Sequence, residues 1–230
     1  MTEGGGGGTF TKEQEEFILR HVRALALAHT EDGRRRGTMG VREREERARG
    51  LDEAERLGLR GRRCGGVFVT YEGRGGERLR GCIGQFFPDD ELVLVVQSRT
   101  VAALHDDRFA DTPITAAELA APGRIQISVS VLSEPVDVPD DVRGDALVAR
   151  VTPGVHGIIV REKRGYRGGT YLPQVCTEQG WSARKFLTHC ALCKAGIPTR
   201  DPLTDKRLAW QTYTATVLCD GNKEEEEDEK

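Results

Sequence analysis

A hairpin signature near the middle of the chain constrains the fold most. Residues 66–71 (GVFVTY) are apolar and β-branched, the run 73–76 is rich in glycine, and residues 78–86 again have the character of a strand. Two such runs joined by a glycine-rich turn are typical of an antiparallel β-hairpin. The sequence therefore predicts a hairpin whose second strand begins with RLRGCIG at 78–84.

The chemistry of this second strand is unusual. Side chains of a strand alternate between its faces, so Arg78, Arg80 and Cys82 should share one face. Two cations beside a thiol favour the thiolate, and Gly81 and Gly84 leave room for a ligand or for another backbone. The alternative is a small buried thiol that packs tightly between glycines. The motif thus indicates either that Cys82 belongs to a functional site or that it is a residue of the core.

Length and composition predict a globular protein of a reducing compartment. At 230 residues, with 37% apolar and 31% charged residues, the chain can bury a core without disulfides or metal. It has no apolar run of the roughly 18 residues that cross a membrane, and its N-terminus lacks the features of a signal peptide. We expect a cytoplasmic protein, with the nucleus as the alternative, no membrane association and six reduced cysteines.

The formal net charge of −3 bears on nucleic-acid binding. Broad binding depends on the neutralisation of phosphates by many cations, and this chain carries a small excess of acids. The charge therefore argues against a non-specific nucleic-acid binder, while a local basic patch stays open.

Helices and strands are intermixed along the chain. Capping residues and apolar residues at helical spacing predict helices at 11–28, about 90–107, about 115–121 and 183–195. Alternating apolar residues predict further strands at 125–132 and 210–219, and residues 157–160 and 169–172 are typical of paired strands around the basic loop 161–167. Since regular βαβ units are absent from this pattern, we expect an α+β fold of mostly antiparallel sheets with flanking helices.

Three segments fall outside this pattern. Residues 1–10 are rich in glycine and residues 220–230 are acidic, so both are expected to be disordered around a domain at 11–219. Residues 30–63 are dense in arginine and glutamate. They indicate either a solvated helix with i,i+4 ion pairs or a mobile insertion.

Two further segments carry candidate chemistry. His156 lies between glycines in a turn before a strand, where it suits a general base or, alternatively, a histidine bonded to local backbone. Gln174, Glu178 and Trp181 lie between a strand and a helix. They could form a binding loop, or Trp181 could anchor the core while the other two complete the helix start.

The cysteine pair Cys190 and Cys193 does not indicate redox or metal chemistry. Both lie inside a predicted helix at i,i+3 spacing, away from the helix N-terminus that activates redox pairs, so core positions are expected. A zinc site with Cys176 and His189 matches no common ligand spacing. No metal and no cofactor are predicted.

Several stretches together resemble the AMMECR1 domain family. They are LRGCIG at 79–84, DDRF at 106–109 leading into ISVSVLSEP at 127–135, GVHGI at 154–158 and GTYLPQV…EQGW…FL at 169–187. The resemblance covers about 66–217. It implies an α+β fold with a larger and a smaller subdomain, with the motifs near a cleft between them.

The resemblance implies no established reaction. The family's wide distribution suggests a role in transcription, replication, repair or translation. In prokaryotes the domain is often encoded with, or fused to, a Memo-like protein and a radical-SAM protein, which suggests a modification pathway and a Memo-like protein partner. We expect binding of a small anionic ligand or partner around RGCIG, through a set of residues comprising Arg78, Arg80, Gly81, Gly84, Tyr171, Gln174 and Glu178.

Two other functions remain open. In the first, Cys82 is a nucleophile, His156 is its general base, and backbone N–H groups at 81–84 stabilise an oxyanion. In the second, the protein is a scaffold that contacts its partners through residues 30–63 and the acidic tail.

Overall fold

The structure is a computed structural model that describes residues 9–33, 39–73 and 78–220. The chain divides into two compact units. Unit 1 contains the residues up to Val131 and from Thr216 onward, and unit 2 contains Leu132–Ala215. Predictions for the glycine-rich lead, the glycine-rich turn and the acidic tail lie wholly or largely outside the described ranges.

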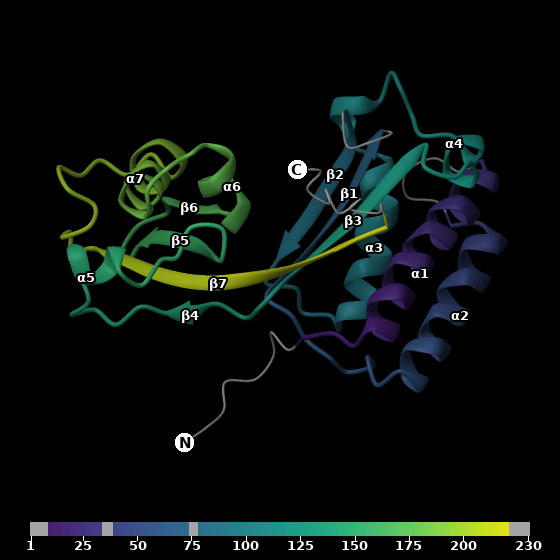
Figure 1. Ribbon diagram of the computed structural model, residues 1–230, viewed down its shortest axis with the longest axis horizontal. Coiled ribbons are helices and arrows are strands. Elements are labelled where there is room, and N and C mark those ends of the chain that lie inside the picture. The colour runs from purple at the N-terminus through teal and green to yellow at the C-terminus, as the bar shows by residue number, and fades with distance from the viewer. Residues whose placement is uncertain (1–8, 34–38, 74–77, 221–230) are drawn as a thin grey trace, which may run out of the picture. The chain divides into compact units, whose positions relative to one another are not determined.

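Unit 1 consists of a sheet with helices on one side (Figure 1). In this unit the strand order is β2-β1-β3, followed by the end of β7. The elements are α1 (Lys12–Glu31), α2 (Val41–Arg56), β1 (Gly66–Gly73), β2 (Leu79–Phe86), α3 (Leu92–Leu104), a 3-10 turn (Asp107–Phe109), α4 (Ala116–Ala120), β3 (Ile125–Leu132) and the last residues of β7 (Leu208–Cys219). One apolar cluster joins α1, α3 and the inner faces of the strands.

The predicted hairpin is confirmed. β1 and β2 are antiparallel, with Thr70 opposite Cys82 and Phe68 opposite Gly84. Alternate residues of β1, among them Val67 and Val69, are fully buried against the helices. The helices predicted at 90–107 and 115–121 and the strand at 125–132 are also present, as α3, α4 and β3.

The first helix starts where the capping box predicts. Thr11 and Gln14 each bond the other's backbone N–H at the start of α1, which satisfies two donors that a helix N-terminus otherwise leaves unpaired. Phe10, assigned from the sequence to the glycine-rich lead, is only 9% exposed. The guanidinium of Arg62 lies 4.0 Å from the centre of its ring, so this end of the lead belongs to the core.

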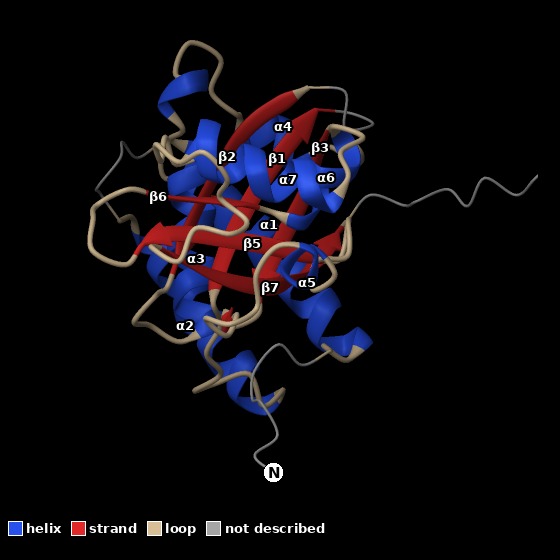
Figure 2. Ribbon diagram, turned by 90° about the vertical axis from the view of Figure 1, so that its left-hand side faces the viewer, coloured by secondary structure: helices blue, strands red, loops and turns tan. Residues whose placement is uncertain are grey.

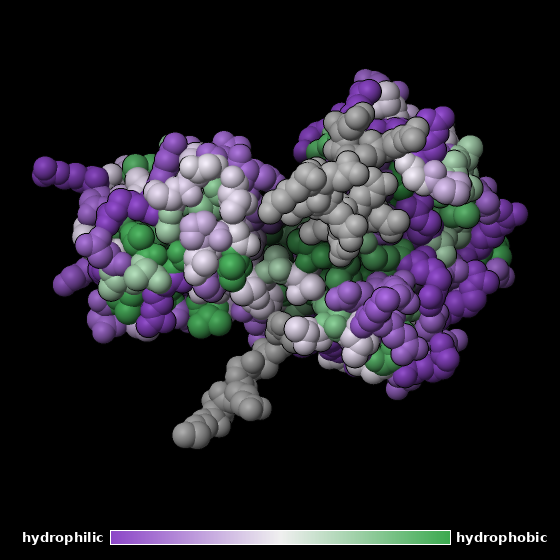
Figure 3. Space-filling view, viewed as in Figure 1, coloured by the Kyte–Doolittle hydropathy of each residue, from purple (hydrophilic) through white to green (hydrophobic). Residues whose placement is uncertain are grey.

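The charged segment 30–63 contains α2, the helix of the two alternatives, and only one of its faces is solvated. Its outward face is hydrophilic (Figure 3), and Arg47 and Glu43 make the expected i,i+4 pair at 2.8 Å. Yet Glu43 is 2% exposed, and its carboxylate lies 2.7 Å from Nδ1 of His29 in α1. Glu46 faces His21 of α1 at 3.2 Å, and this hydrogen bond lowers the pKa of Glu46.

Unit 2 is a smaller antiparallel sheet with short helices beside it (Figure 2). Its strands follow the order β6-β5-β7, and β4 pairs with β7. The elements are β4 (Val136–Asp137), α5 (Asp145–Val148), β5 (His156–Glu162), β6 (Gly168–Tyr171), α6 (Pro173–Glu178), α7 (Ala183–His189), a π-helical turn (Cys190–Lys194) and the first part of β7. The predicted pairing of 157–160 with 169–172 is confirmed, since Ile158 lies opposite Tyr171.

The structure differs from the sequence interpretation at two places in unit 2. The segment read as a loop after residue 172 begins with α6, because Pro173 occupies the first helical turn, where a missing N–H costs nothing. Cys190 is fully buried, and burial raises the pKa of its thiol to about 12. Cys193, however, is exposed, so only one of the two cysteines is a core residue.

The described residues contain no group of three or more His, Cys, Asp or Glu side chains placed to hold a metal ion. None of their helices is both long and apolar enough to span a bilayer.

The strand β7 contributes to both units. Its residues up to Ala215 belong to unit 2, and those from Thr216 belong to unit 1. Directly after it, Asp220 accepts a hydrogen bond from the backbone N–H of Ile127 at 2.7 Å and pairs with Arg23 of α1. Asp220, assigned from the sequence to the acidic tail, is therefore part of unit 1.

Candidate functional site

Cys82 lies on a strand at the edge of the sheet of unit 1. Its partner across the hairpin is Thr70, whose hydroxyl donates to the sulfur of Cys82 at 3.2 Å. The backbone N–H and C=O of Cys82 point away from β1, toward the free edge. Unpaired edge groups need other partners, and here two side chains supply them.

The edge is closed by the DDRF segment. Asp106 accepts the N–H of Cys82 at 2.9 Å, and Arg108 donates to the C=O of Cys82 at 2.9 Å. The two side chains also pair with each other at 2.6 Å. Asp106 and Arg108 thus take the place of a neighbouring strand opposite a single residue, and they fix the backbone that carries the thiol.

This pair has an asymmetric environment. Asp106 is 5% exposed, whereas the side chain of Arg108 is 58% exposed. The hydrogen bond from Arg108, with smaller contributions from the N–H groups of Cys82 and Arg108, lowers the pKa of Asp106 to about 2. Asp106 in turn raises the pKa of Arg108, and Cys82 adds to this effect. The cation beside the thiol is therefore Arg108.

The pair predicts a dependence of stability on pH. A carboxyl with a depressed pKa stabilises the fold above its unfolded-state pKa, and this contribution is lost as pH falls through the folded-state pKa. For Asp106 the two values are 3.8 and about 2, a difference of about 2 kcal/mol. We expect Asp106→Asn to lower the free energy of unfolding by that amount at pH 7, with the loss shrinking between pH 4 and pH 2. Urea unfolding across this range, with exposed Asp111→Asn as control, measures it; parallel pH profiles for wild type and variant would contradict it.

Arg80, which the sequence predicts beside the thiol, is bonded to other groups. Its guanidinium pairs with Glu118 at 2.8 Å, and this hydrogen bond is the main cause that lowers the pKa of Glu118 to about 2. It also donates to the carbonyls of Thr112 and Pro113 at 3.4 Å each. Arg80 therefore ties β2 to the start of α4. Arg78 is exposed just before β2.

The glycines of the motif make room for protein and leave little for a ligand. A Cβ at Gly81 would lie 2.2 Å from the carbonyl oxygen of Ala103 in α3, and one at Gly84 would lie 2.1 Å from the ring of Phe68. Gly81 lets α3 approach the hairpin, and Gly84 lets an aromatic ring lie across β2. Of the two expected neighbours of these glycines, a ligand or another backbone, the structure shows the backbone of α3 at Gly81, and at Gly84 it shows an aromatic side chain.

His156 is bonded to local backbone, which is one of its two predicted roles. It begins β5 in unit 2, and its Nδ1 accepts the backbone N–H of Thr152 at 3.0 Å. Cys82 belongs to unit 1, so no single unit contains both members of the proposed catalytic pair. The N–H of Cys82 is also already donated to Asp106. The predicted oxyanion site at 81–84 therefore loses its central donor.

The remaining predicted residues lie in unit 2. Tyr171 stacks on Phe186 at 5.8 Å between ring centres, its hydroxyl lies 3.0 Å from Nδ1 of His189, and burial raises its pKa. Trp181 packs on His189 at 4.4 Å, as its interpretation as an anchor predicts. Among the other polar residues, Gln174 is half-buried in α6 and Glu178 is exposed at its end.

Comparisons with known proteins agree on one family. A family model described as AMMECR1 matches residues 24–218. Protein MK0488 of Methanopyrus kandleri is 36% identical over 199 residues, which cover 84% of this chain and 82% of that protein. A Methanothermobacter thermautotrophicus protein is 43% identical over 137 residues, covering 58% of this chain and 64% of the relative. The crystal structure of uncharacterized protein PH0010 from Pyrococcus horikoshii matches with a TM-score of 0.63 and 27% identity over 90% of this chain and 92% of that one.

Proposed function

Because the chain belongs to the AMMECR1 family, we propose that the RGCIG motif of this family member forms an anion-binding site whose binding cation is Arg108. The proposal rests on one observation, namely an exposed guanidinium held in a fixed orientation by a buried carboxylate. A cation that is already oriented loses little entropy when it binds a carboxylate or phosphate.

The donors of Arg108 support this function. Its Nε and Nη2 are used by Asp106 and by the carbonyl of Cys82. Among the described residues no hydrogen bond uses its Nη1, which is left to a small carboxylate or phosphate. The hydroxyl of Thr70, on the neighbouring strand β1, lies beside the thiol of Cys82, and the two groups supply further polar contacts. Arg78 and Gln174 are not required for this site.

Three other roles are also proposed for the chain. A Memo-like protein remains a proposed partner, and it could approach the exposed Arg108. A scaffold role for residues 30–63 must accommodate the packing of α2, whose Glu43 and Glu46 are engaged with α1. A catalytic role for Cys82 with His156 as its base is also a proposal, and its two residues belong to different units.

The anion site is tested by alkylation of Cys82 with two reagents of similar size that differ in charge. Iodoacetate is an anion and iodoacetamide is neutral, so the ratio of their rates cancels the fraction of thiolate. A guanidinium about 4 Å from an anion in water contributes about 1 kcal/mol. We expect Arg108→Ala to lower the ratio about fivefold, measured by peptide mass spectrometry at Cys82.

Two controls make the result specific. Arg44→Ala removes an exposed cation from α2 of the same unit and should leave the ratio unchanged. Inorganic phosphate should slow iodoacetate more in the wild type than in Arg108→Ala. A ratio that is equal in wild type and Arg108→Ala, with both proteins folded by circular dichroism, would show that Arg108 does not recruit anions to the motif.

A further inference from the structure

A second charged surface lies in unit 2, at the turn between β5 and β6. We call it the basic hairpin surface; its exposed cations are Arg161, Lys163, Arg164, Arg167, Lys206 and Arg207. Residues 132–215 carry twelve Lys and Arg against nine Asp and Glu, a formal charge of +3, whereas the whole chain has −3. The excess of positive charge in this unit is concentrated at one hairpin.

Acidic neighbours neutralise only part of this surface. Lys163 pairs with Asp140 at 2.7 Å and Arg207 pairs with Asp205 at 2.7 Å. Arg167 lies 3.9 Å from Glu162. In the part of the chain that the structure describes, no carboxylate pairs with the other members of the surface, and three acids face six cations. The surface therefore keeps an excess of about three positive charges for a ligand.

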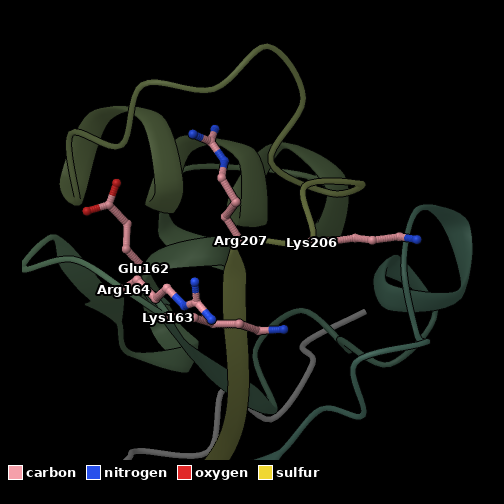
Figure 4. A pocket seen from close by; sticks show the side chains of 5 residues that line it. All are labelled: Glu162, Lys163, Arg164, Lys206 and Arg207. Atoms are coloured by element: carbon pink, nitrogen blue, oxygen red, sulfur yellow. The ribbon is translucent and has the colours of Figure 1, made fainter.

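The cations line two adjoining hollows. One has a volume of about 450 Å³ and is lined by Lys163 and Arg164 after β5 and by Lys206 and Arg207 before β7 (Figure 4). The other, of about 550 Å³, runs along the hairpin past Tyr166. They share Glu162 and Lys163. An extended polyanion, with charges at intervals, fits two neighbouring hollows better than one compact anion.

Tyr166 adds an exposed aromatic ring to the cations of the basic hairpin surface. Its relative exposure is 108%, whereas Tyr71 and Tyr213 are buried. An exposed tyrosine ring offers an apolar face on which a flat, unsaturated group can stack. The hollow that Tyr166 lines is also lined by Arg161, Lys163 and Arg167, so such a group would bind near cations.

We propose that the basic hairpin surface binds single-stranded nucleic acid. Its cations contact successive phosphates and Tyr166 stacks on an unpaired base, which is how proteins bind single strands without reading sequence. A duplex keeps its bases stacked and offers Tyr166 no partner, and an acidic peptide offers charge without a base. The combination of charge and exposed aromatic favours the single strand.

The test is fluorescence anisotropy of the full chain with labelled oligouridylate and oligothymidylate of about 12 nucleotides. In KCl from about 50 to about 200 mM, affinity should fall with salt, and each lost phosphate contact should reduce the slope by about 0.7. Arg164→Ala and Lys206→Ala should each show that reduction. Tyr166→Ala should weaken binding about tenfold with no change in slope, and Tyr166→Phe should restore it.

Arg150→Ala is the matched control, because Arg150 is exposed in the same unit and lines neither hollow. Tighter binding of oligouridylate than of oligothymidylate would identify RNA as the ligand, and equal binding would support both. No binding at about 100 μM protein in low salt would overturn the proposal. So would a duplex or polyglutamate that binds as tightly as the single strands, or a Tyr166→Ala variant that binds like the wild type.

Discussion

Gly81→Ala is expected to destabilise unit 1 strongly. The added Cβ would lie 2.2 Å from the carbonyl oxygen of Ala103 and 3.2 Å from its carbonyl carbon, both backbone atoms of α3. A side chain could rotate away, but a helix backbone moves only with the helix. Overpacking of this kind typically costs 1–3 kcal/mol, and the rigid neighbour places this case at about 3 kcal/mol. Urea unfolding followed by circular dichroism measures the loss.

Gly73→Ala provides the comparison within the same hairpin. A Cβ there would come no closer than 3.6 Å to the carbonyl oxygen of Arg78, an ordinary contact. It should therefore unfold close to the wild-type urea concentration. If the two variants unfold together, α3 does not depend on a glycine at position 81, and this part of the motif would need another explanation.

Glu43→Ala is the second substitution with a large expected effect. Glu43 is 2% exposed and lies 2.7 Å from His29 and 2.8 Å from Arg47. Removing one member of a buried charged cluster leaves its partners without compensation, which costs about 3–5 kcal/mol. We expect a loss of about 3 kcal/mol, because Arg47 can reach solvent, measured as a shift of the urea midpoint.

The neighbour Glu45 gives a matched control, since it is exposed on the same helix. Glu45→Ala should change stability by less than about 0.5 kcal/mol. Equal and small effects at both positions would mean that the contacts of Glu43 with α1 contribute little to stability.

Most helices and strands could be predicted because their signals are local. The capping boxes at Thr11 and Thr115 and the alternation along 125–132 each depend on residues a few positions apart. The interior of α2 could not be predicted in this way. A tract of Arg and Glu normally stays in water. The burial of Glu46 and Glu43 depends on two histidines of α1, which lie twenty-five and fourteen residues away in the sequence.

At the candidate site, too, local features could be predicted from the sequence and contacts between distant residues could not. The face shared by Arg80 and Cys82 follows from strand periodicity, but their partners do not. Glu118 lies 38 residues from Arg80, and Asp106 lies 24 residues from Cys82. The DDRF segment is part of the family resemblance, and its residues alone do not predict which backbone groups they bind. The signal that could have given its role is the edge position of β2, because an edge strand needs partners for its outward backbone groups.

The shared strand β7 has a consequence for how the protein is made. Unit 2 is an insertion within unit 1, and the last contacts of unit 1 come from Thr216 to Asp220. During synthesis, chains generally fold domain by domain from the N-terminus. Here α1 and β3 must wait until Asp220 has left the ribosome to bond Arg23 and Ile127. Unit 2, whose residues are contiguous, can form first, so the part of the chain that is translated earliest is completed last.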